Sequence, residues 1–529
     1  MPLRLTSAAI ARRAGASFAL ACALAAARAQ PPPIVLPPFL VESRSAPDWL
    51  YGREPGFEVL SRCSVDTTRH VLSSVWHARA LFDRMLDGHF EVRRSLPVII
   101  ILCPQEWKPA LPPGAADLLH LPAGPRRGWF APAVQFFPNL YLGSSDLQIV
   151  FFVEPGRVTR YPDVLTPVAA ERELQDRLPP LPPWFVAGFA AHYGRAQWVA
   201  GDTPPDAGFH LAPDTDDTAR RLTARPAEWV SPSETDSFRH DADRPRWLLP
   251  LPELLAGAAP ADPARSQVWR SESELFVRWL LSRVPHGRDV LWRLADAGAR
   301  APMTEAAFER IVGYNYSDAF DALSDFLPEA VSTDFDFPTE NLPEPPDSSL
   351  RFAKPAEITR LKGAWEEAEV EFIRQHYPVL VKTYAEQAEA TLDWGRRSGP
   401  DSPAALALRG LLALDQGDAT GARIYLEAAL RAHVVRPLAY SELAALRLQE
   451  AQAHPLGRGG RLSGPQARFV LEPLWAGRGQ EPQPLAGFLI AAKAAAFCAS
   501  DPGGHFADYL ALGRSLYPQS GERDRYSRK

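Results

Sequence analysis

The chain has 529 residues, of which 46% are hydrophobic and 23% are charged, and its formal net charge is −6. This length exceeds what one hydrophobic core supports, so we expect two or three domains, and the composition excludes a largely disordered chain. The mild negative charge, with arginines that form no basic patch, argues against a nucleic-acid-binding protein.

The first 29 residues are typical of an export signal. Arg4, Arg12 and Arg13 precede an apolar run over 14–27, and an A-x-A cleavage site lies directly before Gln30. The apolar run is too short to span a membrane, so we expect an exported protein, periplasmic or secreted, with no membrane span after cleavage. An uncleaved anchor is the alternative.

Helices and strands alternate after a proline-rich segment over 30–55, which we expect to be a linker. Apolar residues at helical spacing predict a long helix over 65–86, and LPVIIILCP (96–104) predicts a buried strand that contains Cys103. A second strand is expected over 148–153, followed by a pair of helices between 164 and 198.

Two further helices complete this part of the chain, one over 271–283 and one within 303–313. The second is expected to begin after Thr304 as its N-cap and to stop at Gly313. The order of elements predicts an α+β domain over 56–330. The sequence FDFPTENLPEPPDSS is acidic and proline-rich, so we expect a linker over 331–350.

The remaining residues, 351–529, predict a separate all-α domain. The runs AALALRGLLAL (404–414) and LAYSELAALRL (438–448) recur 34 residues apart, with small residues where helices approach closely. This period resembles that of tetratricopeptide repeats, which implies stacked helix pairs that bind a protein or peptide partner. The segment 383–395 then forms the second helix of a preceding repeat. An ordinary helical bundle is the alternative.

The stretch PPWFVAGFAAHY (182–193) resembles a motif of gluzincin-type zinc metallopeptidases, which are peptidase MA-like proteins. In that family an HExxH helix supplies two zinc ligands and a general base, and a second helix, close to P-x-W-x-x-E-G-x-A-x-Y, supplies a third ligand. Trp184, Gly188 and Ala190 match the second pattern, and Ala187 stands at the position of its glutamate. The resemblance implies a zincin-like domain with a small sheet and several helices.

The positions that would bind zinc hold no donor atoms. The best register for HExxH places Ala170 and Leu174 at the two histidine positions and Glu171 at the position of the general base. Because a catalytic zinc needs about three protein ligands, we expect no catalytic residue, no cofactor and no metal here. Glu171 is expected to be a solvated residue paired with Arg172 or Arg177.

Other polar residues nearby offer an alternative, relocated metal site. These residues are Asp163, Glu171, Glu173, Asp176, His192 and His210. Helix geometry directs His192 about 140° away from Ala187, so we expect a partly buried histidine bonded to the backbone.

The aromatic residues Trp184, Phe185 and Phe189 are expected in the core. A groove formed by Trp184, Phe185, His192 and Tyr193 is the alternative.

Two groups of glutamates elsewhere in the chain are expected on solvated helix faces. They are Glu272 with Glu274, and Glu366 with Glu367 and Glu369.

The sequence therefore predicts an exported, non-catalytic metallopeptidase-like protein, a pseudoenzyme, that binds a protein or peptide in the cell envelope. The motif keeps its packing residues and lacks its metal ligands. An active hydrolase with relocated ligands and a purely structural envelope scaffold are the alternatives.

Overall fold

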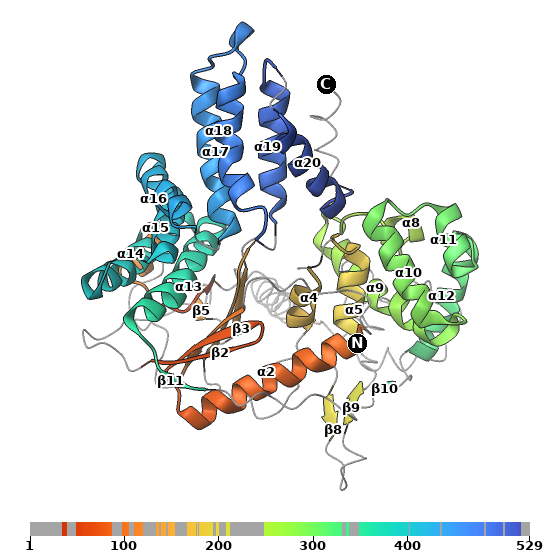
Figure 1. Cartoon of the computed structure of the whole chain (residues 1–529). Coiled ribbons are helices and arrows are strands. Elements are labelled where there is room, and N and C mark those ends of the chain that lie inside the picture. The colour runs from red at the N-terminus through yellow and green to blue at the C-terminus, as the bar shows by residue number, and fades with distance from the viewer. Residues whose placement is uncertain are drawn as a thin grey trace, which may run out of the picture.

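The computed structural model describes residues 34–39, 49–86, 98–104, 111–119, 134–136, 139–143, 146–153, 167–175, 177, 179–193, 197–199, 208–211, 248–330, 335–337, 349–400, 402–433, 436–480, 483–500 and 503–519. These residues form a mixed α+β protein, as expected, in which helix pairs extend from a central sheet toward a second group of helices (Figure 1). The expected export signal lies outside these residues. No helix in these ranges has both the length and the apolar character needed to cross a membrane.

The main sheet has six strands in the order β11-β2-β3-β4-β7-β6. Strands β3, β4 and β7 are parallel, whereas β2, β6 and β11 are antiparallel to their neighbours. The bounds are β2 Leu50–Glu54, β3 Phe57–Ser61, β4 Val98–Cys103, β6 Asn139–Gly143, β7 Gln148–Val153 and β11 Arg351–Phe352. The strands expected within 96–104 and over 148–153 are confirmed as β4 and β7, and Cys103 is fully buried.

Successive residues of the central strands point into two different cores, as the pleat requires. Val59 and Ile100 belong to a core that also contains residues of the helices between 65 and 330. Leu60 and Ile101 belong to a core that also contains residues of the helices after 355. The sheet is therefore covered on both faces.

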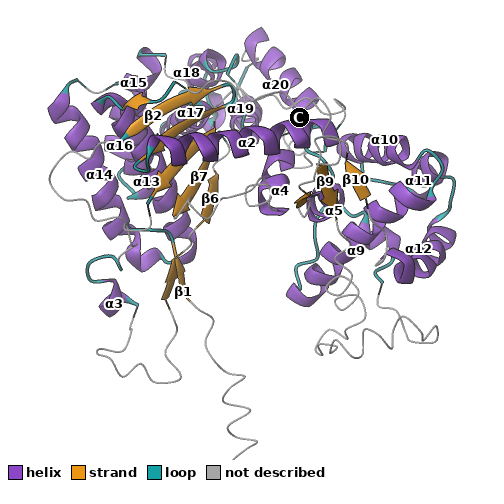
Figure 2. Cartoon of the chain, turned by 90° about the horizontal axis from the view of Figure 1, so that it is seen from below, coloured by secondary structure: helices purple, strands orange, loops and turns teal. Residues whose placement is uncertain are grey.

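The first core is closed by helices that flank one face of the sheet. The expected helix over 65–86 is confirmed as α2 (Val65–Met85), which extends from the sheet toward the α9–α12 group (Figure 2). The other helices are α4 Pro167–Gln175, α5 Pro183–Tyr193, α8 Leu251–Leu254, α9 Pro263–Arg283, α10 Gly287–Arg300, α11 Glu305–Val312 and α12 Tyr316–Ala330.

Helix α11 begins and ends at the residues expected from the sequence. The Thr304 side chain accepts a hydrogen bond from the backbone N–H of Ala307 at 3.3 Å, which satisfies a free amide of the first turn. Gly313 has φ 87°, the left-handed conformation that glycine adopts without a steric penalty.

The C-terminal region consists of helix pairs that follow one another along the chain (Figure 1). The pairs are α13 Pro355–His376 with α14 Val381–Ser398, α15 Pro403–Asp415 with α16 Ala419–Arg431, α17 Pro437–Ala453 with α18 Gly464–Ala476, and α19 Leu485–Phe497 with α20 Gly504–Leu516. Short 3-10 turns cover Pro378–Leu380 and Arg458–Gly460. The two runs that recur in the sequence lie in α15 and α17, each the first helix of its pair.

The expected linkers contain regular structure. Residues 30–55 contribute β2 and also β1 (Ile34–Leu36), which pairs in parallel with β5 (Val134–Phe136). Residues 331–350 contribute β10 (Phe335–Phe337), which joins β8 (Gln197–Val199) and β9 (Gly208–Leu211) in a small antiparallel sheet. Proline clusters favour extended chain, and extended chain with apolar residues between the prolines can pair as a strand.

Helices α13, α14 and α15 share a core with the sheet, whereas α17 to α20 form a core of their own. Strand β11 pairs with β2, and Trp365 of α13 stacks on Phe151 of β7 with ring centroids 4.9 Å apart. The expected boundary at 331–350 therefore falls between elements that are packed together. A short helix, α3 (Ala115–Leu118), also contributes Ala115 to this core.

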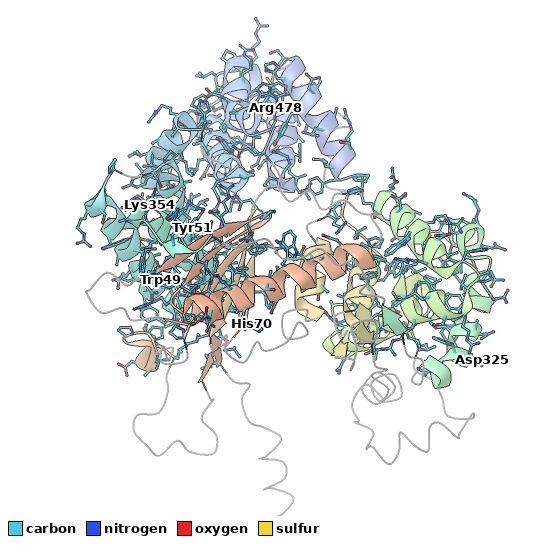
Figure 3. All side chains as sticks on the ribbon, turned by 60° about the horizontal axis from the view of Figure 1, so that its bottom comes forward. Trp49, Tyr51, His70, Asp325, Lys354 and Arg478 are labelled. Atoms are coloured by element: carbon cyan, nitrogen blue, oxygen red, sulfur yellow. The ribbon has the colours of Figure 1, made fainter. Side chains whose placement is uncertain are left out.

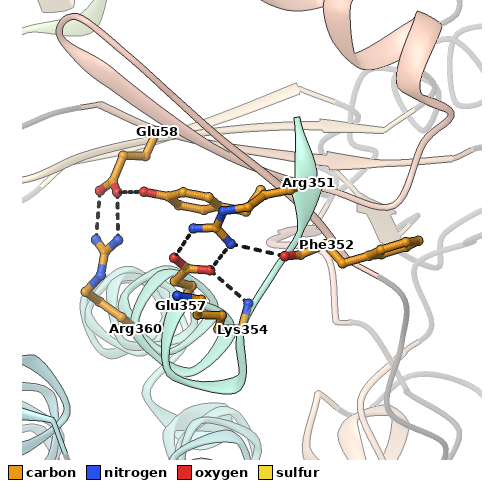
Figure 4. Close-up of polar contacts among 7 residues, drawn as sticks. Glu58, Arg351, Phe352, Lys354, Glu357 and Arg360 are labelled. Carbon is orange, nitrogen blue, oxygen red and sulfur yellow. Dashed lines mark hydrogen bonds and ion pairs between the residues drawn. The ribbon is translucent and has the colours of Figure 1, made fainter. Parts of the chain in front are cut away.

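Ion pairs add to the contact between the sheet and α13 (Figure 4). The Glu58 carboxylate accepts hydrogen bonds from both terminal nitrogens of Arg360, each at 2.7 Å, and from the Tyr51 hydroxyl at 2.6 Å. Burial raises the pKa of Glu58, but the hydrogen bonds and charge of Arg360 outweigh it and hold that pKa below its usual value. Trp49, Tyr51 and Lys354 lie on this side of the molecule, away from Asp325 of α12 (Figure 3).

Candidate functional site

Helix α5 is buried along nearly its whole length. Every residue from 184 to 190 is buried, and Trp184, Phe185 and Phe189 have no exposed surface. The Trp184 and Phe276 rings lie 5.2 Å apart, and the Phe185 and Phe189 rings are also 5.2 Å apart. A helix that is apolar on all sides is stable only inside a core. The expectation that these aromatic residues are core residues is confirmed.

Gly188 permits the close approach of α5 to α9. A side-chain carbon at this position would lie 2.3 Å from the backbone oxygen of Ser273, closer than atoms can approach. Only glycine fits at this crossing, so its occurrence in the motif follows from packing and requires no chemistry.

The three positions that the sequence resemblance assigns to zinc ligands lie in one apolar core. Ala170 and Leu174 are fully buried, Ala187 is 7% exposed, and all three belong to the core that contains Trp184. None of these side chains carries a donor atom, so the residues do not fit a zinc ion. Across the described ranges, no three His, Cys, Asp or Glu side chains are grouped to hold a metal.

Glu171 forms a weak ion pair with a residue distant in sequence. Its carboxylate lies 3.4 Å from Arg270 Nη1 on α9, and it accepts a hydrogen bond from the Gln175 side chain at 3.3 Å. The ion-pair partner of Glu171 is therefore Arg270 and not Arg172 or Arg177, the two partners that were expected. The Glu171 side chain is 25% exposed and that of Arg270 is 55% exposed, so solvent screens the attraction.

Glu173 has a structural role at the opposite side of α4. It accepts a hydrogen bond from Arg79 Nε of α2 at 3.2 Å, and Arg79 also donates to the carbonyl oxygen of Gly56 at 3.0 Å. This contact holds α4 against α2 and against the turn that precedes β3.

The other residues of the alternative metal site are not brought together in the described part of the chain. His192 is fully buried near the end of α5, more deeply than expected. His210 lies in β9, and its side chain is outside the described atoms, as are residues Asp163 and Asp176.

Three of the four residues of the alternative groove on α5 are buried, so they do not form an open groove. Trp184, Phe185 and His192 are each 0% exposed, and the Tyr193 side chain lies outside the described atoms. Trp184 alone of these contributes to a described cavity, which lies at the N-terminal end of α5.

The glutamates expected on solvated helix faces are in fact buried, and that expectation was wrong. On α9, Glu272 is 0% exposed and Glu274 is 1% exposed. Glu274 pairs with the equally buried Arg278 at 2.7 Å, which compensates its charge. Glu272 accepts a hydrogen bond from the Leu249 N–H at 2.6 Å, and burial raises its pKa to about 8.

The glutamates of α13 are also buried, each at 4% exposure or less. Lys362 Nζ lies 3.1 Å from Glu366, which also accepts a hydrogen bond from Gln387 at 3.0 Å. Burial raises the pKa of Glu369 well above its usual value, and the nearby Glu366 charge adds to this. Lys362 lies on α13 itself, whereas Gln387 comes from α14, so the sequence pattern did not show that another helix covers this face.

Glu367 belongs to a buried charge cluster that joins α13, α17 and the turn between β6 and β7. Arg436, directly before α17, lies 3.0 Å from Asp146 and 3.8 Å from Glu367. Asp146 also accepts a hydrogen bond from the Leu438 N–H at 2.9 Å. Burial raises the pKa of Glu367 to about 8, although the Arg436 charge opposes the shift. The opposite charges of this cluster connect α13, the residue before α17 and the turn between β6 and β7.

No family model, curated protein or solved structure matches this chain.

Proposed function

We propose that this chain is an exported, non-catalytic protein with a gluzincin-like domain that lacks its zinc ligands and with a tetratricopeptide-like helical region. Its role is to bind a protein or peptide partner in the cell envelope. One observation carries the proposal: the three ligand positions Ala170, Leu174 and Ala187 are all filled by apolar side chains within one packed core.

The order of the elements supports the gluzincin-like part. Helix α2, strand β4 and strand β7 precede the helix pair α4 and α5, which is the order that the resemblance implies. The loss of donor atoms, together with the retained close approach at Gly188, is what a binding function built on an enzyme fold would leave.

The packing of α15 against α16 supports the tetratricopeptide-like part. A side-chain carbon at Gly410 would lie 2.6 Å from Leu426 Cγ, so the small residue in the first helix receives a large residue of the second. Pairs of this kind, stacked side by side, provide extended surfaces for partners.

Metal analysis tests the non-catalytic proposal directly. The purified protein, prepared without chelator, should contain far less than one zinc per chain and should not hydrolyse unstructured peptides. A stoichiometric zinc whose removal abolishes peptide hydrolysis would instead support the alternative of an active hydrolase with relocated ligands.

A matched variant tests the register of the two helices. Ala170→His, Leu174→His and Ala187→Glu in one chain restore the full ligand set, and this variant should bind about one zinc per chain. Bound zinc should then raise the melting temperature, because it stabilises only the folded state. A control variant with Ala187→Glu alone should not bind zinc, and zinc should not raise its melting temperature. A folded triple variant that gains no zinc contradicts the register.

The partner site that we favour within the gluzincin-like domain is the edge of the sheet at β6. Strand β6 is the last strand of the main sheet on the side where α4 lies, and Gln148 of the adjacent β7 donates a hydrogen bond to the Arg172 carbonyl of α4 at 3.4 Å. An extended peptide can add to a free sheet edge through backbone hydrogen bonds.

A pair of proline variants tests this edge. Backbone N–H groups alternate along a strand, so one of Leu140→Pro and Tyr141→Pro removes a donor to β7 and the other removes a donor at the outer edge. The variant with near-wild-type stability should lose peptide binding, measured with a library of extended peptides. Retained binding in that variant excludes the β6 edge.

A purely structural scaffold is the second candidate, favoured by the shared core between the sheet and α13. Peptide capture by the intact chain distinguishes the two, because a scaffold would hold no peptide at either β6 or the helix pairs.

Export is tested by the mass of the mature protein. Cleavage at the expected site gives a chain that begins at Gln30 and lies outside the cytoplasm. An intact N-terminus in the cytoplasmic fraction would contradict this part of the proposal.

A further inference from the structure

The loop between α17 and α18, together with the end of α19, forms one end of the helical region. We call this surface the tip (residues 454–463 and 496–500). Arg436, directly before α17, binds Asp146 at the sheet, so α17 leads away from the sheet. Since α17 has 17 residues, it is about 25 Å long. The tip therefore lies at the outer end of the C-terminal helices, at the top of Figure 1.

Hydrogen bonds tie the loop of the tip to α19. The Leu462 N–H donates to the Phe497 carbonyl at 3.0 Å, and Arg461 Nη2 donates to the Ala496 carbonyl at 2.8 Å. Within the loop, the Gly457 N–H donates to the Arg461 carbonyl at 2.8 Å. A side-chain carbon at Gly457 would lie 2.7 Å from that carbonyl oxygen, so this turn requires glycine. The side chains that the tip exposes are thus held in place.

The tip exposes two large apolar side chains. Leu456 is 77% exposed, the highest value for a large apolar residue in the described ranges, and Phe497 is 43% exposed. Apolar surface gains free energy when it is removed from water. Two such side chains on one tied surface indicate that a partner covers them.

Arginines surround these apolar side chains. Arg458 and Arg461 belong to the loop, and both are exposed. Arg468 of α18 also directs its charge to this end of the helix, because a side-chain carbon at Gly464 would lie 3.4 Å from its Nη1. The tip therefore carries positive charge beside apolar surface.

No acidic residue of the two segments offsets this charge. The sequence has no aspartate or glutamate over 451–471 or over 483–500. Glu450, at the end of α17, is paired with Arg423 of α16. Because the formal net charge of the whole chain is −6, the tip is a local exception to an acidic protein.

We propose that the tip docks on an anionic lipid surface, with Leu456 and Phe497 in the interface and the arginines at the headgroups. A phospholipid layer offers both complements together, because its negative headgroups lie directly above hydrocarbon. Docking in this way would hold an exported chain at a membrane with its main sheet turned away from the lipid. The proposal goes beyond the peptide-binding function and does not depend on it.

Vesicle flotation tests the proposal with the full-length exported protein. The protein should bind vesicles of equal parts phosphatidylglycerol and phosphatidylcholine, and should bind phosphatidylcholine vesicles at least about tenfold more weakly. Raising the salt from about 50 mM to about 300 mM should weaken the binding, because salt screens the charges. Equal binding to both vesicles, or no binding to the anionic ones, overturns the proposal.

Two double variants separate charge from apolar contact. Arg458→Ser with Arg461→Ser should weaken binding to the anionic vesicles about tenfold or more. Leu456→Ser with Phe497→Ser should weaken it about fivefold or more. Unchanged melting temperatures show that these variants fold, and Leu456→Ser alone serves if the change at Phe497 disturbs folding.

Matched controls remove similar groups elsewhere. Arg396→Ser with Arg397→Ser removes two exposed arginines of α14, and Ile424→Ser removes a side chain of α16 that is 63% exposed. Both controls should bind like the wild type. All variants share one N-terminus, so any contribution of the export signal cancels. Equal losses in the control and tip variants overturn the proposal.

A dye at position 456 distinguishes lipid from an acidic protein. Leu456→Cys, labelled with nitrobenzoxadiazole, should become brighter on the anionic vesicles and should not respond to polyglutamate, which supplies charge without hydrocarbon. The unsubstituted chain, labelled in the same way, corrects for dye on the half-buried Cys63. A response to polyglutamate as large as that to vesicles would indicate an acidic polypeptide as the partner and overturn the proposal.

Discussion

Helices α5 and α13 are both buried, yet the residues they bury are opposite in chemistry. From 184 to 190, α5 buries only apolar residues and a glycine. Helix α13 buries Lys362, Glu366, Glu367 and Glu369, with Glu366 and Glu369 at 1% exposure each. The first helix is stabilised by apolar area and shape, and the second depends on specific partners for its charges.

The difference shows that burial alone does not identify a functional site. Helix α5 resembles the motif of an enzyme family, and Ala187, at the position of that motif's ligand, carries no donor atom. Helix α13 carries an acidic sequence that predicts a solvated surface. Its Glu366 is instead buried beside Lys362 and Gln387, and its Glu367 is buried beside Arg436. Substitutions that disturb shape should therefore act most strongly at α5, and substitutions that remove charge should act most strongly at α13.

The largest effect is expected for Gly188→Leu. The new side chain cannot fit against the Ser273 backbone, so we expect a loss of about 3–5 kcal/mol in the free energy of unfolding, or a chain that does not fold. Denaturant unfolding measures the loss. Gly257→Leu, where the structure leaves open space, should change stability by about 0.5 kcal/mol or less. A similar cost for both would contradict the close packing of α5 on α9.

Arg436→Met should have the next largest effect. It leaves Asp146, which is 1% exposed, without its arginine, and an uncompensated buried charge costs about 3–4 kcal/mol of stability at neutral pH. Adding Asp146→Asn removes that charge and should recover about 1–2 kcal/mol. Purely additive losses in the double variant would show that the pair is not coupled.

A pH dependence of stability should follow from Glu272. Its folded pKa of about 8 lies above the usual value of 4.5, so its stabilising contribution is fully present below pH 4.5 and is lost as the pH rises toward 8. Thermal unfolding of the wild-type protein and of Glu272→Gln between pH 5 and 8 should reveal a difference that changes by roughly 1–3 kcal/mol. Parallel curves would show that Glu272 is ionised in the folded protein.

The smallest effect is expected for Glu171→Ala. Its pairing with Arg270 is half solvated, so stability should change by about 0.5 kcal/mol or less. Peptide binding should be unaffected. A large loss of any hydrolytic activity in this variant would restore Glu171 as a general base and contradict the non-catalytic proposal.

The sequence predicted those features that depend on residues close together in the chain. The strand ending at Cys103, the cap at Thr304, the stop at Gly313 and the core aromatic residues of α5 all follow from side-chain size, period and capping. These rules act over a few residues, and the structure agrees with them.

Features that depend on distant partners were not predictable in the same way. Glu58 pairs with Arg360 across 302 positions, and Asp146 pairs with Arg436 across 290. No pattern within a single helix indicates that a charged face will meet a complementary charge from another part of the chain. The strand β10 within the expected linker over 331–350 was not predicted for the same reason, because its partner β9 lies far earlier in the chain.

During synthesis, one face of the main sheet can be covered by helices earlier than the other face. The core with Val59 and Ile100 is completed by helices that end at residue 330, whereas the core with Leu60 and Ile101 needs residues up to Leu412. At about 5–20 residues per second, the second face waits several seconds after the first is closed. A ribosome-bound chain that has emerged only to residue 330 has a sheet with one apolar face still exposed. A chaperone that binds unfolded chains should therefore bind it until α13 to α15 have emerged.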